Sequence, residues 1–158
     1  MNPRLRLGFH VTGGAGAGGG TSSQGVGLMG EIGVVLRDQF SLTFRNSGMA
    51  LPGFGLMVMA LVGLDYSLSD KFTVGGGGGA MFLIAPTNSS MSIVLPFRVT
   101  FAPFSREPEA VARRGLLVSL EAGPAYGFRT YAGRGSPAPM PITLFGFSAQ
   151  LSVGFAWW

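Results

Sequence analysis

The stretch that decides the fold is residues 144–158, which reads Leu-Phe-Gly-Phe-Ser-Ala-Gln-Leu-Ser-Val-Gly-Phe-Ala-Trp-Trp. Alternate positions are apolar and largely aromatic: Phe145, Phe147, Ala149, Leu151, Val153, Phe155 and Trp157. The positions between them are small or polar. Successive side chains of a strand point to opposite faces, so the stretch predicts one apolar face and one small, polar face. Its length and aromatic end are typical of the strand that closes a transmembrane β-barrel.

The composition of the whole chain agrees with this interpretation. The 158 residues are expected to form one domain, 1–158. Hydrophobic residues make up 47% and charged residues only 11%, against about 25% charged in soluble domains. Yet no run approaches the ~20 apolar residues of a membrane helix, and the longest candidate, 54–64, is broken by glycine. A transmembrane barrel resolves this conflict, because its apolar residues occupy every second position.

Other counts exclude several classes of protein. The 27 glycines argue against a helical fold. The chain has no cysteine, so it has neither a disulfide framework nor a thiolate metal site. The net charge of +4 is not gathered into a basic stripe, so we expect no nucleic-acid partner. The first residues contain no apolar signal segment, and we expect the signal peptide of an exported protein to be absent from this sequence.

Eight segments show the alternation, which predicts an all-β, eight-stranded antiparallel up-and-down barrel. The expected strands are 4–12, 26–36, 40–46, 54–66, 72–84, 91–102, 116–130 and 144–158. Short turns at 37–39 and 67–71 and a longer charged connection at 103–115 would be periplasmic, together with both termini. The outer loops would be 13–25, 46–53, 85–90 and 131–141. Pro96 predicts a bulge, because proline cannot donate to the ladder.

All strand charges fall on the face opposite the apolar one. An Arg or Lys facing lipid at the midplane costs about 2–4 kcal/mol, which explains this distribution. Buried charges need partners. The pattern therefore predicts a polar, side-chain-filled interior with an ion-pair network, in which Gly75, Gly77 and Gly79 leave room for arginines. The predicted network comprises Arg6, Glu31, Arg45, Asp65, Arg98, Glu121 and Arg129. Arg4 takes the same parity.

Outward aromatic residues gather near the predicted periplasmic strand ends. Aromatic rings favour the boundary between hydrocarbon and water, so these positions predict a membrane-interface girdle. The predicted girdle comprises Phe40, Tyr66, Phe72, Phe101, Phe155 and Trp157.

With these features the chain resembles the small eight-stranded bacterial outer-membrane β-barrels of the outer-membrane protein A and X type. The resemblance rests on the alternating strands, on the inward Glu31, Arg45, Arg98 and Glu121, and on the C-terminal strand 151–158. It implies a bilayer containing lipopolysaccharide as the surroundings. It also implies that the aromatic end of the last strand is read by the barrel-assembly machinery. The alternation matches that signal at Trp157 and leaves Trp158 as an extra residue.

The sequence contains only weak matches to the motifs of catalytic, cofactor-binding or metal sites. Residues 14–19 match G-x-G-x-x-G, but no helical pattern follows, so we expect a flexible surface loop rather than a dinucleotide site. His10, the only histidine, is expected to point inward near the outer rim, without enough ligands around it for a metal. We therefore predict no catalytic residue, no cofactor and no metal.

The leading hypothesis is a non-enzymatic outer-membrane barrel that serves as a membrane anchor or interaction module. In this role it could be a subunit of a larger envelope complex. Its protein partner would bind the outer loops or the periplasmic segment 103–115. The alternatives are a narrow pore for small solutes and a lipid-modifying enzyme that uses His10 with Ser22, Ser23 or Ser47. A soluble lipocalin-type barrel would need the apolar face to point inward, and the sparse strand charge disfavours it.

Overall fold

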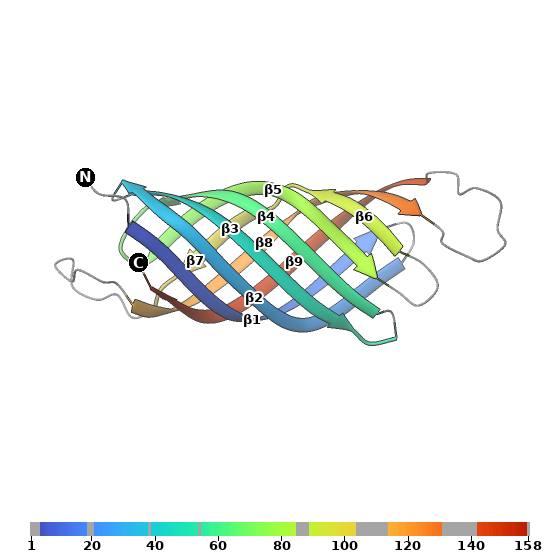
Figure 1. Ribbon diagram of the computed structural model, residues 1–158, viewed down its shortest axis with the longest axis horizontal. Helices are drawn as coiled ribbons and strands as arrows, with labels where there is room; N and C mark the ends of the chain where they lie inside the picture. The colour runs from blue at the N-terminus through green and yellow to red at the C-terminus, as the bar shows by residue number, and fades with distance from the viewer. Residues whose placement is uncertain are drawn as a thin grey trace.

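The computed structural model describes residues 4–18, 21–37, 39–53, 55–84, 89–103, 114–130 and 142–157. Within these ranges the chain forms strands, drawn in Figure 1. They are β1 (Arg4–Gly18), β2 (Thr21–Arg37), β3 (Phe40–Leu51), β4 (Gly55–Ser67), β5 (Phe72–Ile84), β6 (Ser89–Val94), β7 (Phe97–Phe101), β8 (Arg114–Thr130) and β9 (Ile142–Trp157). Over the same ranges, the structure has no helix long and apolar enough to cross a membrane.

The strands form a closed barrel. Apart from β6 and β7, each strand pairs antiparallel with the next along the chain, and β9 pairs with both β8 and β1. β6 and β7 both lie between β5 and β8, so they are two halves of one wall strand. The result is an eight-stranded antiparallel up-and-down barrel, which confirms the predicted fold class.

Pro96 lies at the break between β6 and β7. Proline has no N–H to donate to the ladder, so regular pairing is interrupted at this residue. The wall stays connected through two backbone hydrogen bonds. Gly77 N–H donates to Pro96 O at 3.0 Å, and Leu95 N–H donates to Pro124 O at 3.1 Å. Val94 lies opposite Gly79 and Ala125, and Phe97 lies opposite Gly76 and Ala122, so the register is the same on both sides of Pro96. The ladder is interrupted without an inserted residue, and the predicted bulge is wrong.

Two loops predicted from glycine content are wrong. β1 and β2 stay paired from Gly13 opposite Val26 to Gly18 opposite Thr21, so most of the predicted loop 13–25 is strand. β3 likewise continues to Leu51 and takes up most of the predicted loop 46–53. Glycine favours turns only in the absence of other constraints, and here both neighbours of β1 supply continuous hydrogen-bond partners.

Several other predictions fall partly or wholly on residues outside the described ranges, and residues 85–88 of the predicted loop 85–90 are among them. Residues 14–18 of the glycine motif lie in β1, so for them the surface-loop prediction is also wrong. The predicted loop 131–141 and residues 104–113 of the connection 103–115 lie outside the described residues, as does Trp158.

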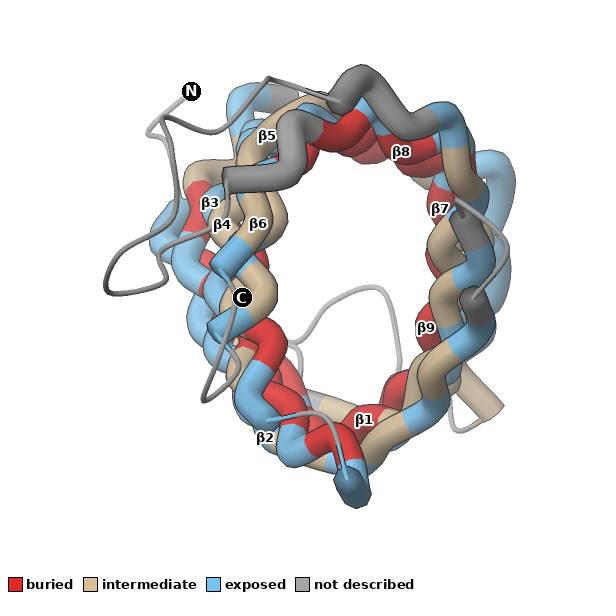
Figure 2. Tube along the Cα trace, turned by 90° about the vertical axis from the view of Figure 1, so that its right-hand side faces the viewer, coloured by how far each residue is buried: buried red, intermediate tan, exposed pale blue. Residues whose placement is uncertain are grey.

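The barrel has its apolar side chains on the outside. In Figure 2 exposed and buried residues alternate along the strands. Large apolar side chains with outward parity are 36% exposed at Phe101 and 72% exposed at Phe145, with many others in between. A soluble domain buries such residues. The side chains that are buried instead include many polar and charged ones.

The six girdle residues lie at one end of the barrel (Figure 1). The start of β1, the end of β9 and the turns β2–β3 and β4–β5 lie at the same end. Five of their side chains are exposed, and Tyr66 is half-buried. Two pairs of rings are in contact across strands. The ring centroids of Phe40 and Tyr66 are 4.8 Å apart, and those of Phe72 and Phe101 are 4.9 Å apart. The Tyr66 hydroxyl donates to Gln39 Oε1 at 3.3 Å, as a ring at a polar boundary would.

Candidate functional site in the barrel lumen

Charged side chains from six strands meet inside the barrel, and we call them the lumen network. They are Arg6 on β1, Glu31 on β2, Arg45 on β3, Asp65 on β4, Arg98 on β7 and Glu121 on β8. Each is at most 7% exposed. Three guanidinium groups face three carboxylates, so the network is balanced in formal charge. These are six of the seven residues predicted for the interior. The side chain of Arg129 lies outside the described residues, and Arg4 is exposed at the end of β1.

Two salt bridges of the network cross the lumen. In the sheet, Glu31 lies opposite Arg45, and Arg98 lies opposite Glu121. The side chains do not form salt bridges with these strand neighbours but with each other's. Arg98 Nη1 lies 2.6 Å from Glu31 Oε2, and Arg45 Nη1 lies 3.0 Å from Glu121 Oε2.

These bridges join opposite walls of the barrel. Around the closed sheet, β2 and β7 are separated by the same number of strands in both directions, and so are β3 and β8. An arginine side chain is long enough to pass its strand neighbour and reach across a lumen that side chains can fill. The two bridges therefore close the lumen from four different strands.

Arg98 is the centre of the network. It also lies 3.5 Å from Asp65 Oδ2, and its Nη2 donates to Ser119 Oγ at 3.2 Å. Arg6 approaches both acids from the side of the termini, through its Nε to Glu31 and its Nη1 to Asp65. Removing one member of such a set leaves a buried charge without compensation, which is far more costly than the intact pairing.

Glycines make room for the network, although not as the sequence suggested. A Cβ atom at Gly63 would overlap the guanidinium of Arg45, and one at Gly75 would overlap the carboxylate of Asp65. At Gly77 and Gly79 a Cβ would instead overlap the backbone of β4. The predicted role of these glycines was room for arginines, whereas Gly63, which the sequence reasoning missed, provides that room.

His10 lies in the middle of β1 and beside the network, not near the outer rim as predicted. β1 continues from His10 to Gly18, and this extension places the residue deep in the barrel. A Cβ at Gly8 would lie 2.9 Å from His10 Nε2 and 3.3 Å from Glu31 Cβ, so these two side chains flank one small space. His10 is fully buried, and neither ring nitrogen forms a hydrogen bond with another described residue.

The serines considered with His10 do not join it. The described hydrogen bonds include none from His10 to Ser22, Ser23 or Ser47. Ser47 is buried opposite Met29 and Met59, and Ser23 lines a separate cavity. Across the described ranges, no three His, Cys, Asp or Glu residues are grouped so that they could hold a metal ion.

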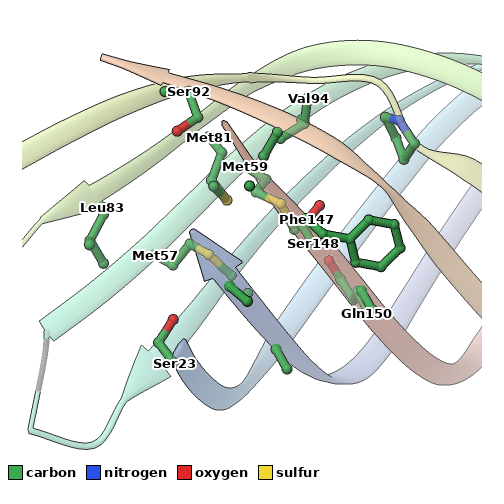
Figure 3. A pocket seen from close by; sticks show the side chains of 18 of the residues that line it. Ser23, Met57, Met59, Met81, Leu83, Ser92, Val94, Phe147, Ser148 and Gln150 are labelled. Atoms are coloured by element: carbon green, nitrogen blue, oxygen red, sulfur yellow. The ribbon is translucent and has the colours of Figure 1, made fainter. Parts of the chain in front are cut away.

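Beyond the network, toward the end away from the termini, methionines and other apolar residues line much of the lumen, together with the polar Ser23, Ser90, Ser92, Ser148 and Gln150. A cavity of about 190 Å³ lies there, which we call the methionine cavity. Met57, Met59 and Met81 lie together on its wall in Figure 3. Met49 lines it as well and lies opposite Met57 in the sheet, while Met59 lies opposite Met81. Glu121 belongs to both the cavity wall and the lumen network, so it marks their boundary.

The sequence reasoning missed this cavity. It predicted a polar interior, which describes the network and the polar residues around it but not the methionine-lined half. A signal was present, because Met49, Met57, Met59 and Met81 all have inward parity and lie toward one end of their strands.

Comparisons with known proteins identify the fold only. No protein-family model matches the chain, and no curated protein matches it in sequence. Among solved structures, it is similar to Neisserial surface protein A, an eight-stranded outer-membrane β-barrel, with a TM-score of 0.56 and 10% sequence identity. The match covers 99% of this chain and 98% of that one. The chain therefore has the fold of the small outer-membrane barrels.

Proposed function

We propose that this protein is a non-enzymatic barrel of the bacterial outer membrane, which acts as a membrane anchor or interaction module and does not conduct. The observation that carries the proposal is the pair of salt bridges across the lumen, Arg98–Glu31 and Arg45–Glu121.

The outer surface supports insertion into a bilayer. Every charged side chain of the lumen network points inward, while exposed positions of the same strands carry residues such as Ile32, Phe44 and Leu120. The cost of a charge facing hydrocarbon explains this separation. The exposed aromatic residues at the end with the termini would lie at the membrane boundary, and β9 would be the strand read by the assembly machinery.

The geometry of the lumen supports a barrel that is closed to small ions. A conducting path would have to pass between the two crossing salt bridges, both of which have buried partners. Opening it would separate charges in a poorly solvated space, and breaking a buried pair costs about 3–5 kcal/mol. Such an open state would be rarely populated, so we expect the resting protein to be impermeable to small ions.

The proposal of no enzymatic activity is supported by the place of His10. A lipid-modifying site would need this histidine at the outer rim, next to a nucleophile and an acid. His10 instead lies beside Glu31 and the arginines at mid-strand. The function would then reside in segments that a rigid barrel presents, namely the connections at the far end and the periplasmic segment 103–115.

Planar-bilayer recording tests the closed lumen. Protein refolded in detergent, and checked by the mobility shift that heating causes in folded barrels, is expected to give no discrete conductance steps. A matched variant, Val99→Ala on the outer face of β7, controls for preparation effects and is expected to behave identically. Reproducible unitary openings of the unmodified protein would contradict the proposal and favour the narrow pore.

Pull-down from envelope extracts tests the interaction module. A protein lacking residues 104–113 is compared with the full chain and with a protein lacking 132–140, each inserted in vesicles. We expect one deletion to abolish capture of a specific protein and the other to leave it unchanged. If both deletions retain every captured protein, the assignment of partner binding to these segments is wrong.

A further inference from the structure

The methionine cavity has no part in membrane anchoring, yet methionines line one side of it and Glu121 lies at its boundary with the lumen network. We propose that it binds a small aromatic molecule that carries one hydrogen-bond donor, with the ring among the methionines and the donor directed at Glu121. The class is that of indoles and phenols. The proposal rests on the size of the cavity, on its sulfur-rich wall and on one carboxylate oxygen.

The size of the cavity limits the ligand. Its volume is about 190 Å³. An engineered apolar cavity of about 150 Å³ in another protein stays dry and binds benzene. The cavity is therefore large enough for a ring system slightly bigger than benzene.

The wall favours an aromatic ring. Met49, Met57, Met59 and Met81 come from three adjacent strands, and the register sets them in two facing pairs. Thioether sulfur makes favourable contacts with aromatic rings, and the unbranched methionine side chain adjusts to the shape of its neighbour. Buried Leu61 and Val94 continue the apolar surface of the cavity.

Glu121, at the boundary between the cavity and the lumen network, supplies a hydrogen-bond acceptor. Glu121 Oε2 is engaged by Arg45, whereas its buried Oε1 accepts no hydrogen bond from any other described residue. A buried carboxylate oxygen without a donor is costly, and an N–H or O–H of a ligand would satisfy it. Glu121 is part of the cavity lining, and because its Oε1 is closed to solvent, the donor of a ligand reaches that oxygen after a small displacement of the side chains around it.

Methionine methyl NMR tests the site with indole as the probe. Protein labelled at the methionine methyl carbons is refolded in detergent micelles and titrated with indole. We expect saturable shifts of Met49, Met57, Met59 and Met81. Met91, which faces outward and is 42% exposed, reports only partition of indole into the micelle. If the four lumen methyls follow Met91 without saturation, the proposal is overturned.

Substitutions that fill the cavity should weaken the binding of indole. Ser92→Phe places a ring into the cavity from β6, and Ile93→Phe places the same ring on the outer face of that strand. We expect indole to bind Ser92→Phe at least about tenfold more weakly and Ile93→Phe within about twofold of the unmodified protein. Ala125→Leu fills the cavity from β8 and provides a second test if Ser92→Phe does not show the heat-dependent mobility shift. Unchanged indole affinity in a folded, filled variant would overturn the proposal.

The donor is tested with indene, which has the shape of indole without its N–H. Because a hydrogen bond to a buried carboxylate is strong, we expect indole to bind at least about fivefold more tightly than indene. Equal affinities would overturn the contact with Glu121. Thioethers are also ligands for copper(I), so a parallel titration with this ion is informative. Saturable shifts with copper(I) and none with indole would replace the aromatic ligand with a soft metal ion.

Discussion

The two halves of the lumen share one outer surface but differ in the side chains that fill them. Toward the termini, the inward positions hold the lumen network, its partners Ser41 and Ser119, and buried threonines. Toward the far end, inward positions of the same β3 and β4 hold Met49, Met57 and Met59. Strand parity decides only whether a residue faces lipid or lumen. The chemistry of the lumen is set separately, by distance along the barrel axis.

The difference has an energetic consequence. The half with the network depends on complete pairing, because each charge is compensated by groups on other strands. The methionine half depends on volume, and flexible side chains tolerate changes of shape. The same kind of substitution should therefore have very different effects in the two halves.

The largest effect is expected for Arg98→Met. It removes one of the two guanidinium groups that Glu31 and Asp65 share and leaves three buried carboxylates with two arginines, so we expect the free energy of unfolding to fall by about 3–5 kcal/mol. Urea unfolding in lipid vesicles measures this. Thr100→Val, two residues along β7, removes one buried hydroxyl and should cost about 1 kcal/mol. A loss below about 1 kcal/mol for Arg98→Met would show that the network does not stabilise this half.

The shared outer surface is tested by Ile32→Arg. Ile32 is 48% exposed, lies next to Glu31 in sequence and faces away from the lumen. A charge at mid-height should cost about 2–4 kcal/mol, whereas Leu36→Arg near the end of β2 should cost about 0–1 kcal/mol. The same unfolding assay compares the two. Equal costs at the two depths would argue against a bilayer around the barrel.

A smaller effect is expected for Gly63→Ala. The added methyl group overlaps the guanidinium of Arg45 and should displace it from Glu121, at a cost of about 1–3 kcal/mol. Gly30→Ala is the matched control, because a Cβ there meets nothing within 4 Å. If both variants unfold at the same urea concentration as the unmodified protein, Arg45 does not need the space that Gly63 provides.

The smallest effect is expected in the methionine half. Met59→Leu nearly conserves volume among apolar neighbours and should change the free energy of unfolding by less than about 1.5 kcal/mol. Arg98→Lys, an equally modest change in the other half, should cost more, because lysine lacks the planar, multiply donating guanidinium. A larger cost for Met59→Leu than for Arg98→Lys would reverse the proposed difference between the halves.

The sequence predicts the barrel well, because its signal is local. Period-two alternation assigns faces strand by strand, and the structure places Arg6, Glu31, Arg45, Asp65, Arg98 and Glu121 inside on that basis. The strand ends were less predictable. Glycine-rich residues 13–18 suggested a loop, yet β2 and β9 pair with them on both sides. Only the tertiary partners reveal that these residues are extended.

The site is less predictable than the barrel, because it depends on contacts across the lumen. Register alone favours Glu31 with Arg45, whereas two of the salt bridges join opposite walls. Gly63 becomes important only after Arg45 is known to extend over it. The methionine cavity depends on axial position, which parity does not encode.

The measurement that tests the central claim most directly is a nitroxide scan along β9 in lipid vesicles. The chain has no cysteine, so single cysteines at positions 150–156 can be labelled one at a time. We predict that oxygen accessibility peaks at Leu151, Val153 and Phe155, which face lipid, and falls at the lumen positions between them. Loss of this alternation, or high accessibility of the three outward positions to a water-soluble nickel reagent, would contradict a membrane barrel with a closed lumen.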